Sequence, residues 1–588
     1  MIRTLKYLTK KEWGLVFLAL VFIVVQVWLE MTIPGYMSDI TLLIETEGSE
    51  MSDILSAGSK MLACALGSLA SSIIVAAASA RIASNYSAVL RDKLFHKVQS
   101  FSMEEIGRFS TASLITRSTN DVTQVQMLIV MGLQMLIKAP ITAVWGICKI
   151  VGKAWEWTLI IVIAVVVLLL VVGICIALAF PKFRKMQLLT DDINRVTREN
   201  LTGLQVVRAY NAEKYQEDKF DRANNNLNRT QLFTYRVMAF LMPTIQMIMS
   251  GISLAVYWVG AVLINDSAMD EKMTLFSDMV VFSQYAVYVI MSFMMLVMIF
   301  MMLPRASVAG KRIMEVMDTK CRIIDGTRKN GESGQSGEIE FRDVSFRYLD
   351  SEGAEGNVLE HISFTAHRGE TIAFIGSTGC GKSTLINLVP RFYDVTEGQV
   401  LVDGVNVKEY AQKELRNKIG YVSQKAMLFG GTIRSNVSYG DNGKQSADTE
   451  QVAEAIEIAQ ASEFVEKLAD KYDSFVAQGA SNFSGGQKQR LSISRAIARD
   501  PEILIFDDSF SALDYKTDRI LRNALQKHCK NTTKMIVAQR IGTIRDVDKI
   551  VVLDDGKVAG IGTHKELMQN CETYQQIALS QLSKEELA

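Results

Sequence analysis

The chain has 588 residues, which is too long for a single hydrophobic core and predicts at least two domains. Its 63 Lys and Arg residues balance its 63 Asp and Glu residues, so it lacks the positive field that nucleic-acid-binding proteins use, and we expect no nucleic-acid partner. Its seven cysteines have no CxxC spacing, which predicts reduced thiols rather than a zinc or redox site.

The first half contains segments that are apolar enough to cross a membrane, which takes about 20 residues. Four uncharged segments have this character: 61–80, 157–180, 237–265 and 279–304. Two more are interrupted, because segment 13–29 runs into Glu30 and segment 122–148 contains Lys138. No small-residue cleavage site follows the first segment, so we expect a retained helix there. The sequence therefore predicts six membrane-spanning helices.

The loops between these segments predict the orientation in the cell membrane. Segments 1–13, 81–121 and 182–236 together contain 21 Lys and Arg, whereas the alternate loops contain four Lys. Because Lys and Arg stay on the cytoplasmic side, both termini and the C-terminal domain are predicted to be cytoplasmic. The two long basic segments lack strand-like alternation, so we expect helices that continue well beyond the bilayer.

Sulfur-containing and polar residues in the membrane half have alternative interpretations. Thirteen of the 28 methionines lie between Met238 and Met302, where they either line a cavity that adapts to varied apolar ligands or fill space between helices and lipid. Glu30 and Lys138 are either functional charges or groups that snorkel or border an aqueous cavity. Three more polar side chains at membrane depth are expected to face an interior: Gln246, Gln284 and Tyr285.

The composition changes near residue 321. Residues 322–337 are polar and glycine-rich, which predicts an exposed linker. Short β-branched segments then alternate with helical stretches, which indicates an α/β domain with a largely parallel sheet. The predicted strands are 371–375, 419–422, 503–506 and 535–537. The predicted domains are an all-α transmembrane domain of six helices at 1–321, the linker, and an α/β P-loop nucleotide-binding domain at 338–582.

A GxxxxGK[ST] motif follows the first of these strands and precedes a helix-like segment. In this context the loop turns its backbone N–H groups onto phosphates, Lys382 reaches the outer phosphates and Ser383 ligates Mg²⁺. We assign no redox role to Cys380, which occupies a variable position. The predicted nucleotide-binding loop comprises Gly376, Ser377, Thr378, Gly379, Cys380, Gly381, Lys382, Ser383 and Thr384.

A second motif, ILIFDDS, ends the strand 503–506. Asp507 at the end of this strand places a carboxylate beside Mg²⁺. An SGGQ motif precedes KQRLSISRAIARDP, and its glycines permit close backbone approach to an anion at the start of a helix. The cofactors predicted from these motifs are ATP and Mg²⁺.

The order of these motifs resembles the nucleotide-binding domain of the ATP-binding cassette (ABC) family. The ordered set is Tyr348, GSTGCGKST, Gln424, SGGQ, ILIFDDS, SALD and AQR. With six spans ahead of it, the chain resembles a half-transporter of the ABC exporters over nearly its whole length. The resemblance implies that Tyr348 stacks on adenine, that Gln424 contacts Mg²⁺ or water, and that Asp514 belongs to the D-loop. It also implies that four residues contact ATP bound to the opposite subunit: Ser484, Gly485, Gly486 and Gln487.

Two positions depart from the family pattern. Asp508 replaces the glutamate that polarises the attacking water, and Gln539 replaces the histidine that contacts the γ-phosphate. Both are catalytic positions, and both changes are expected to slow hydrolysis while leaving ATP binding intact. The chain therefore resembles the degenerate-site subunit of heterodimeric bacterial multidrug exporters, whose SGGQ motif completes the site of a second half-transporter subunit.

The predicted function is a subunit of an ATP-driven translocase that exports amphipathic small molecules or lipids by alternating access. Segments 113–121 and 206–215 resemble the coupling helices of the family. Two alternatives stay open at this point. One is a peptide exporter, and the other is an ATP-gated regulator or channel without net transport.

Overall fold

The computed structural model describes residues 2–45, 49–151, 153, 155–348, 356–440 and 447–581. The chain divides into two compact units. The first comprises Met1–Gln99 and Ala112–Thr319, and the second comprises Ser100–Thr111 and Lys320–Ala588. The predicted domain limits at residues 321 and 337 remain predictions.

Six helices in the described residues of the first unit are long and apolar enough to cross a membrane, which confirms the predicted number of spans. They are α1 (Lys10–Glu45), α2 (Met51–Gln99), α5 (Val122–Ile150), α6 (Trp155–Thr202), α8 (Glu213–Asp266) and α9 (Met269–Asp318). A short 3₁₀ helix, η1 (Ile2–Tyr7), precedes them. The two interrupted segments form continuous helices despite Glu30 and Lys138.

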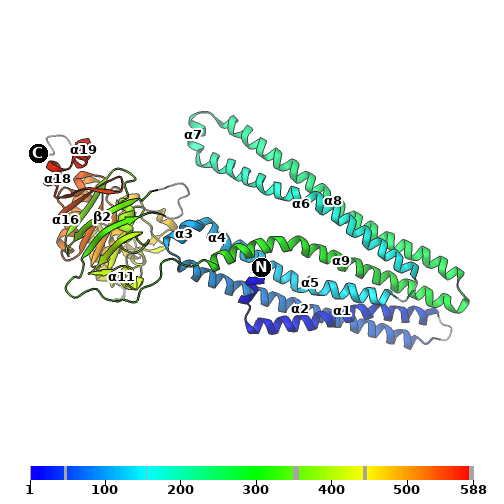
Figure 1. Cartoon of the computed structure of the whole chain (residues 1–588). Helices are drawn as coiled ribbons and strands as arrows, with labels where there is room; N and C mark the ends of the chain where they lie inside the picture. Colours follow the sequence, from blue (N-terminus) through cyan, green and yellow to red (C-terminus); the bar gives the residue numbers. More distant parts are fainter. Residues whose placement is uncertain are drawn as a thin grey trace. The chain divides into compact units, whose positions relative to one another are not determined.

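The long helices pack in neighbouring pairs, α1 with α2, α5 with α9, and α6 with α8 (Figure 1). The buried rings of Trp157 in α6 and Phe282 in α9 lie 5.4 Å apart within the apolar cluster that joins these helices. Tyr285 is also buried, and its hydroxyl donates to the Met31 carbonyl of α1 at 2.9 Å. Of the three polar groups expected to face an interior, Tyr285 therefore joins two helices, whereas the two glutamines are exposed on this chain.

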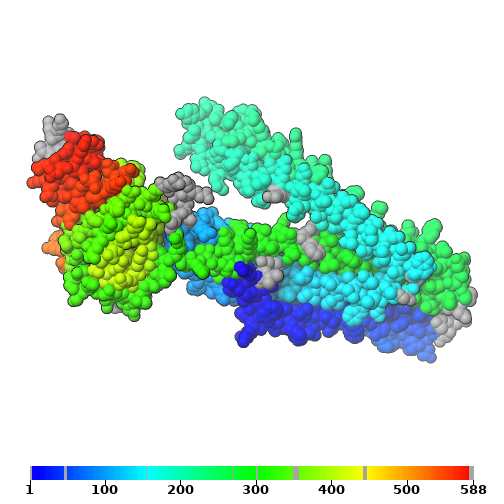
Figure 2. Space-filling view, in the orientation of Figure 1, coloured from blue at the N-terminus to red at the C-terminus, as the bar shows by residue number. Residues whose placement is uncertain are grey.

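Three helices continue well past their apolar segments, as predicted. α2 runs to Gln99, α6 runs to Thr202, and α8 begins at Glu213. The short helix α7 (Leu204–Ala209) joins α6 to α8 and falls where the second coupling segment is expected. Figures 1 and 2 show that this end of the α6–α8 pair stands apart from the other long helices of the first unit.

The first expected coupling segment, 113–121, is helical and runs into a long helix. It is not a separate helix, because α4 (Thr111–Thr116) and the π-helical turn η2 (Arg117–Asp121) continue directly into α5. The Arg117 guanidinium donates to the Glu315 carboxylate at 2.8 Å and holds this stretch along α9. The separate short helix is α3 (Met103–Phe109), which belongs to the second unit.

The core of the second unit is a six-stranded sheet of order β12-β11-β3-β10-β9-β6, which confirms the predicted α/β domain. Its strands are β3 (Thr371–Gly376), β6 (Ile419–Val422), β9 (Ile503–Asp507), β10 (Thr533–Val537), β11 (Lys549–Asp554) and β12 (Lys557–Gly562). All neighbours pair in parallel except β11 and β12. Val537 pairs with both Phe374 and Asp507, so the carboxyl ends of three central strands meet at one edge.

An antiparallel sheet of order β2-β1-β4-β5 packs beside this core. Its strands are β1 (Ile339–Phe346), β2 (Leu359–Ala366), β4 (Glu397–Val402) and β5 (Val405–Asn406). A small ladder joins β7 (Gly431–Thr432) to β8 (Phe475–Val476). The helices are α10 (Lys382–Leu388), α11 (Gln412–Asn417), α12 (Ile433–Val437), α13 (Thr449–Ile458), α14 (Ser462–Val465), η3 (Lys471–Asp473), η4 (Gln478–Ala480), α15 (Gly485–Ala498), α16 (Tyr515–His528), α17 (Ile541–Ile544), α18 (His564–Asn570) and α19 (Glu572–Gln581).

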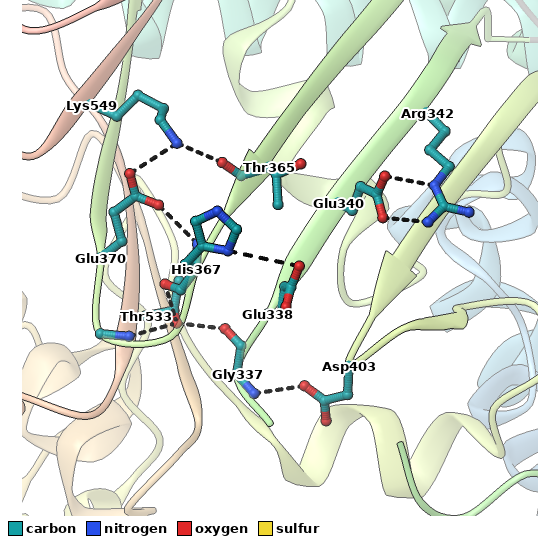
Figure 3. Close-up of polar contacts among 11 residues, drawn as sticks. Gly337, Glu338, Glu340, Arg342, Thr365, His367, Glu370, Asp403, Thr533 and Lys549 are labelled. Carbon is teal, nitrogen blue, oxygen red and sulfur yellow. Dashed lines mark hydrogen bonds and ion pairs between the residues drawn. The ribbon is translucent and has the colours of Figure 1, made fainter. Parts of the chain in front are cut away.

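The chain enters β1 through a set of polar contacts at Gly337 (Figure 3). The Gly337 N–H donates to Asp403 Oδ1 at 2.7 Å, and its carbonyl accepts from Thr533 Oγ1 at 2.5 Å. Burial raises the pKa of Asp403, and an ion pair with Lys418 Nζ at 2.8 Å opposes this shift. These contacts fasten the end of segment 322–337 to the sheet edge opposite Asp507.

Candidate functional site

The glycine-rich loop leaves β3 at the edge where the parallel strands end and leads into α10. Gly381 caps α10 with φ +96°, a left-handed conformation that favours glycine. A Cβ at this position would also lie 2.7 Å from Leu359 Cδ2. At Gly376 a Cβ would lie 2.1 Å from the Leu553 carbonyl oxygen of β11, so close backbone packing requires glycine there.

Lys382 and Ser383 project from the first turn of α10 toward the loop and β9. Lys382 is buried, and its Nζ donates to the carbonyls of Gly376 at 2.9 Å and Ser377 at 2.7 Å. Ser383 Oγ donates to Asp507 Oδ1 at 2.6 Å. Burial raises the pKa of Asp507, while the Ser383 hydrogen bond and the Lys382 charge oppose that rise.

Asp508 lies one residue beyond β9 in a left-handed conformation, with φ +47°. Its N–H donates to the Val537 carbonyl at 3.1 Å, which holds the backbone turn. The buried carboxylate then accepts two side-chain hydrogen bonds at the same oxygen, Oδ2, from Gln539 Nε2 at 2.8 Å and Gln424 Nε2 at 3.4 Å. Burial raises the pKa of Asp508, and the Gln424 hydrogen bond opposes the rise. The two residues that depart from the family pattern therefore contact each other.

A residue that sequence reasoning missed holds the backbone of Gln539. Gln581, at the end of α19, donates from Nε2 to the Gln539 carbonyl at 2.7 Å. Its Oε1 accepts from the Ile541 N–H at 2.8 Å. The C-terminal helix thus fixes the loop that presents the Gln539 side chain to Asp508. Gln581 lies 42 residues from Gln539, and its surrounding sequence has no motif that could have marked it.

The SGGQ motif forms the N-terminus of α15. Ser484 is the N-cap, and it exchanges hydrogen bonds with Gln487, from Ser484 N to Gln487 Oε1 at 2.9 Å and from Gln487 N to Ser484 Oγ at 3.4 Å. Both residues are at the protein surface. A third residue of this helix, the buried Gln489, donates to the Ser423 carbonyl at 3.4 Å and links α15 to the residue before Gln424.

Asp514 and Tyr348 also occupy positions with defined local roles. Asp514 caps α16, and a hydrogen bond from the Thr517 N–H holds the pKa of its carboxyl below the usual value. The Tyr348 hydroxyl lies 3.0 Å from Thr384 Oγ1 in the nucleotide-binding loop. The Tyr348 ring packs edge-on against Tyr393 at 5.3 Å, so an aromatic group stands beside the loop with part of its ring exposed.

The residues at this edge fit ATP with Mg²⁺. The Ser383 hydroxyl and the Asp507 carboxylate meet here and offer the hard oxygen ligands that Mg²⁺ prefers. Gln424, whose Nε2 contacts Asp508, carries a further oxygen of this kind in its amide. No group of three or more His, Cys, Asp or Glu residues that could hold a metal occurs in the described ranges. This donor set suits an ion that shares its coordination with phosphates, and Lys382 supplies a positive charge beside it.

Comparison with known proteins identifies the family. Residues 16–293 match the family described as ABC transporter transmembrane region, and residues 359–511 match the family described as ABC transporter. An uncharacterised ABC transporter ATP-binding protein of Mycobacterium bovis is 38% identical over 493 residues, which cover 84% of this chain and 83% of that protein. The chain belongs to the ABC transporters. It carries one transmembrane domain and one ATP-binding domain, the composition of a half-transporter.

Two further comparisons bear on this ABC transporter. An ATP-dependent lipid A-core flippase of Aromatoleum aromaticum is 31% identical over 501 residues, covering 84% of this chain and 80% of the flippase. A solved structure of a bacterial Atm1-family ABC exporter with ATP bound aligns with a TM-score of 0.76 at 22% identity, over 96% of this chain and 98% of that one. This ABC transporter therefore has the domains and the fold of an ATP-driven exporter.

Proposed function

We propose that the chain is the slowly hydrolysing subunit of a heterodimeric, ATP-driven exporter of amphipathic small molecules or lipids. One observation carries the proposal. The Asp508 carboxylate and the Gln539 side-chain amide occupy the two positions that depart from the family pattern, and they bond to each other at 2.8 Å. Each side chain is therefore hydrogen-bonded to the other.

Asp508 is a poor general base in this setting. Aspartate is one methylene shorter than glutamate, so its carboxylate falls short of the position from which glutamate reaches water. A displacement of about 1 Å in a reacting group lowers a rate by about 100-fold. In addition, Oδ2 accepts hydrogen bonds from both Gln539 and Gln424, and these hold the carboxylate toward the two amides.

Gln539 adds a second defect. A neutral amide does not supply the positive charge that a protonated histidine brings to a phosphate, and loss of a positioned acid or base typically lowers a rate by about 10²- to 10⁴-fold. When bound, ATP supplies the phosphates that Lys382 and Ser383 would hold. Neither Lys382 nor Ser383 depends on Gln539 for its hydrogen bonds. Nucleotide binding is therefore expected to be retained while turnover is low.

The SGGQ motif supports the proposal that this chain completes the active site of a second subunit. Ser484 and Gln487 lie at the exposed N-terminus of a 14-residue helix, where backbone N–H groups and the helix dipole favour an anion. A partner that carries glutamate and histidine at the positions of Asp508 and Gln539 would thus have a fast site completed by this chain. The flippase relative supports a lipid-like substrate, and the Lys and Arg distribution supports a cytoplasmic nucleotide-binding domain.

Steady-state phosphate release tests this assignment. The purified full-length chain, reconstituted alone, is expected to bind ATP and hydrolyse it slowly. Co-reconstitution with a half-transporter that carries the glutamate and histidine should restore fast turnover and ATP-dependent uptake of amphipathic dyes or lipids into inverted vesicles. Lys382→Ala in this chain is the control for contaminating ATPases. Fast turnover by the chain alone, abolished by Lys382→Ala, would refute the slow-site assignment.

A further inference from the structure

A charged cluster joins three helices in the middle of the membrane unit. Lys138 Nζ of α5 lies 2.9 Å from Glu30 Oε1 of α1. The same oxygen accepts from Gln26 Nε2 at 2.9 Å and from Ser68 Oγ of α2 at 3.2 Å. The two charges that interrupt the apolar segments are thus paired with each other, and the pair is neutral as a whole.

The ion pair is open on one side. The side chains of Glu30 and Lys138 are 18% and 21% exposed, while Gln26 and Ser68 are buried. All three hydrogen bonds that Glu30 accepts within the described chain reach Oε1, which leaves Oε2 able to accept more, and an ammonium group carries three donors. Charge exposed to hydrocarbon is costly, so the open side is expected to face water or a polar ligand rather than lipid tails.

An open apolar hollow on α5 begins at Pro140, two residues after Lys138. It has a volume of about 500 Å³, and its walls are Pro140, Ile141, Val144, Trp145 and Cys148. Residues 138, 141 and 145 are spaced by three and four, so they share one face of α5. The apolar surface of α5 is therefore adjacent to Lys138, one member of a neutral pair of opposite charges. An amphipathic molecule complements this combination.

The geometry points to a binding site for a zwitterionic amphiphile, with its cationic group on Glu30, its anionic group on Lys138 and its chain in the α5 hollow. This inference rests on the proposed export of amphipathic molecules and names the class of headgroup. A ligand with a single charge would replace one partner and leave the other unpaired in a medium of low dielectric constant, which is strongly unfavourable. A zwitterion replaces both partners at once.

Equilibrium dialysis of radiolabelled amphiphiles tests this site without ATP. The full-length chain is placed in phosphatidylglycerol nanodiscs, which contain no zwitterionic lipid. Four probes share a ten-carbon chain: decylphosphocholine, decyltrimethylammonium, decyl phosphate and decyl maltoside. Decylphosphocholine is expected to bind about tenfold or more tightly than the other three, because it alone replaces both charges. Equal affinities for all four probes would overturn the inference.

Single neutralisations should convert the preference according to the charge that remains. Glu30→Gln leaves the ammonium and should favour decyl phosphate, whereas Lys138→Met leaves the carboxylate and should favour decyltrimethylammonium. The double exchange Glu30→Lys with Lys138→Glu keeps both charges and should retain decylphosphocholine binding. Retained binding would show that helices altered at these two positions still assemble. Lys153→Met with Asp278→Asn removes a different ion pair of similar exposure and should leave all four affinities unchanged. Unchanged preferences in both single variants would refute the site.

The failure of this inference can be told apart from failure of the proposed function. Dialysis requires neither hydrolysis nor a partner subunit. If vesicle uptake is absent but the charge-dependent preferences are observed, only the export proposal fails. If uptake is observed and the Glu30 and Lys138 variants bind the four probes as the unaltered chain does, only the headgroup site fails.

Discussion

Restoring the two departing residues should convert the slow site into a self-sufficient one. Glutamate at position 508 extends the carboxylate by one C–C bond, about 1.5 Å. A positional gain of this size is expected to raise phosphate release by about 10- to 100-fold. The increase in rate is limited while Gln539 is present, because its Nε2, which lies 2.8 Å from the Asp508 carboxylate, holds the carboxylate at position 508 by a hydrogen bond.

Asp508→Glu combined with Gln539→His should therefore exceed the product of the two single effects. The side chains are in contact, and contacting residues show interaction energies of about 0.5–3 kcal/mol in double-mutant cycles. We expect about 100-fold or more faster hydrolysis by the double variant than by the unaltered chain. Two copies of this variant would supply both complete active sites, since each keeps its own SGGQ motif.

The assay is phosphate release by the chain purified without any other ABC subunit, with ATP affinity measured in parallel. Lys382→Ala in each background sets the rate of contaminating enzymes. If the double variant binds ATP normally but hydrolyses it within about twofold of the unaltered chain, the contact between positions 508 and 539 is not the cause of slow turnover.

Three further outcomes follow from hydrogen bonds in the nucleotide-binding domain. Gln581→Ala in the fast double variant should lower kcat about tenfold without weakening ATP binding, because it frees the backbone that presents residue 539. Gln576→Ala on the same helix is the control and should leave kcat unchanged. Equal kcat values for these two variants would contradict the role of Gln581. Ser484→Ala in this chain should lower ATP turnover by the heterodimer about 100-fold, while this chain's own nucleotide-binding loop still binds ATP. An unchanged turnover rate of the heterodimer would exclude a contribution of Ser484 to the partner's site. Asp403→Ala should reduce the free energy of unfolding by about 2 kcal/mol in thermal denaturation, because the Gly337 N–H loses its acceptor and Lys418 keeps only its second partner, Glu502. An unchanged midpoint would show that these contacts are not stabilising.

Much of the fold was predictable because its signals are local. Mean hydropathy over about 20 residues marks each span, and a single charge such as Lys138 does not offset the surrounding apolar residues. The contact between Ser383 and Asp507 was also implied, since both follow parallel strands whose carboxyl ends share an edge. The antiparallel sheet was missed because β1 has register shifts against both β2 and β4, which interrupt the alternation that marks a strand.

The remaining features depend on contacts between residues far apart in the sequence. The substitutions at 508 and 539 were recognisable one at a time, but their hydrogen bond spans 31 residues and required the pairing of β9 with β10. Glu30 and Lys138 are 108 residues apart, so their pairing could not be distinguished from two separate charges.

The unbroken length of α8 has a mechanical consequence. Residues 213–236 extend beyond its apolar segment by about 36 Å, at 1.5 Å for each residue. A tilt of about 10° about the membrane surface would displace the far tip by about 6 Å, close to one helical pitch. If α8 moves as a rigid rod, the same tilt displaces its opposite, apolar end by a comparable distance, so a movement at the tip is transmitted across the length of the helix.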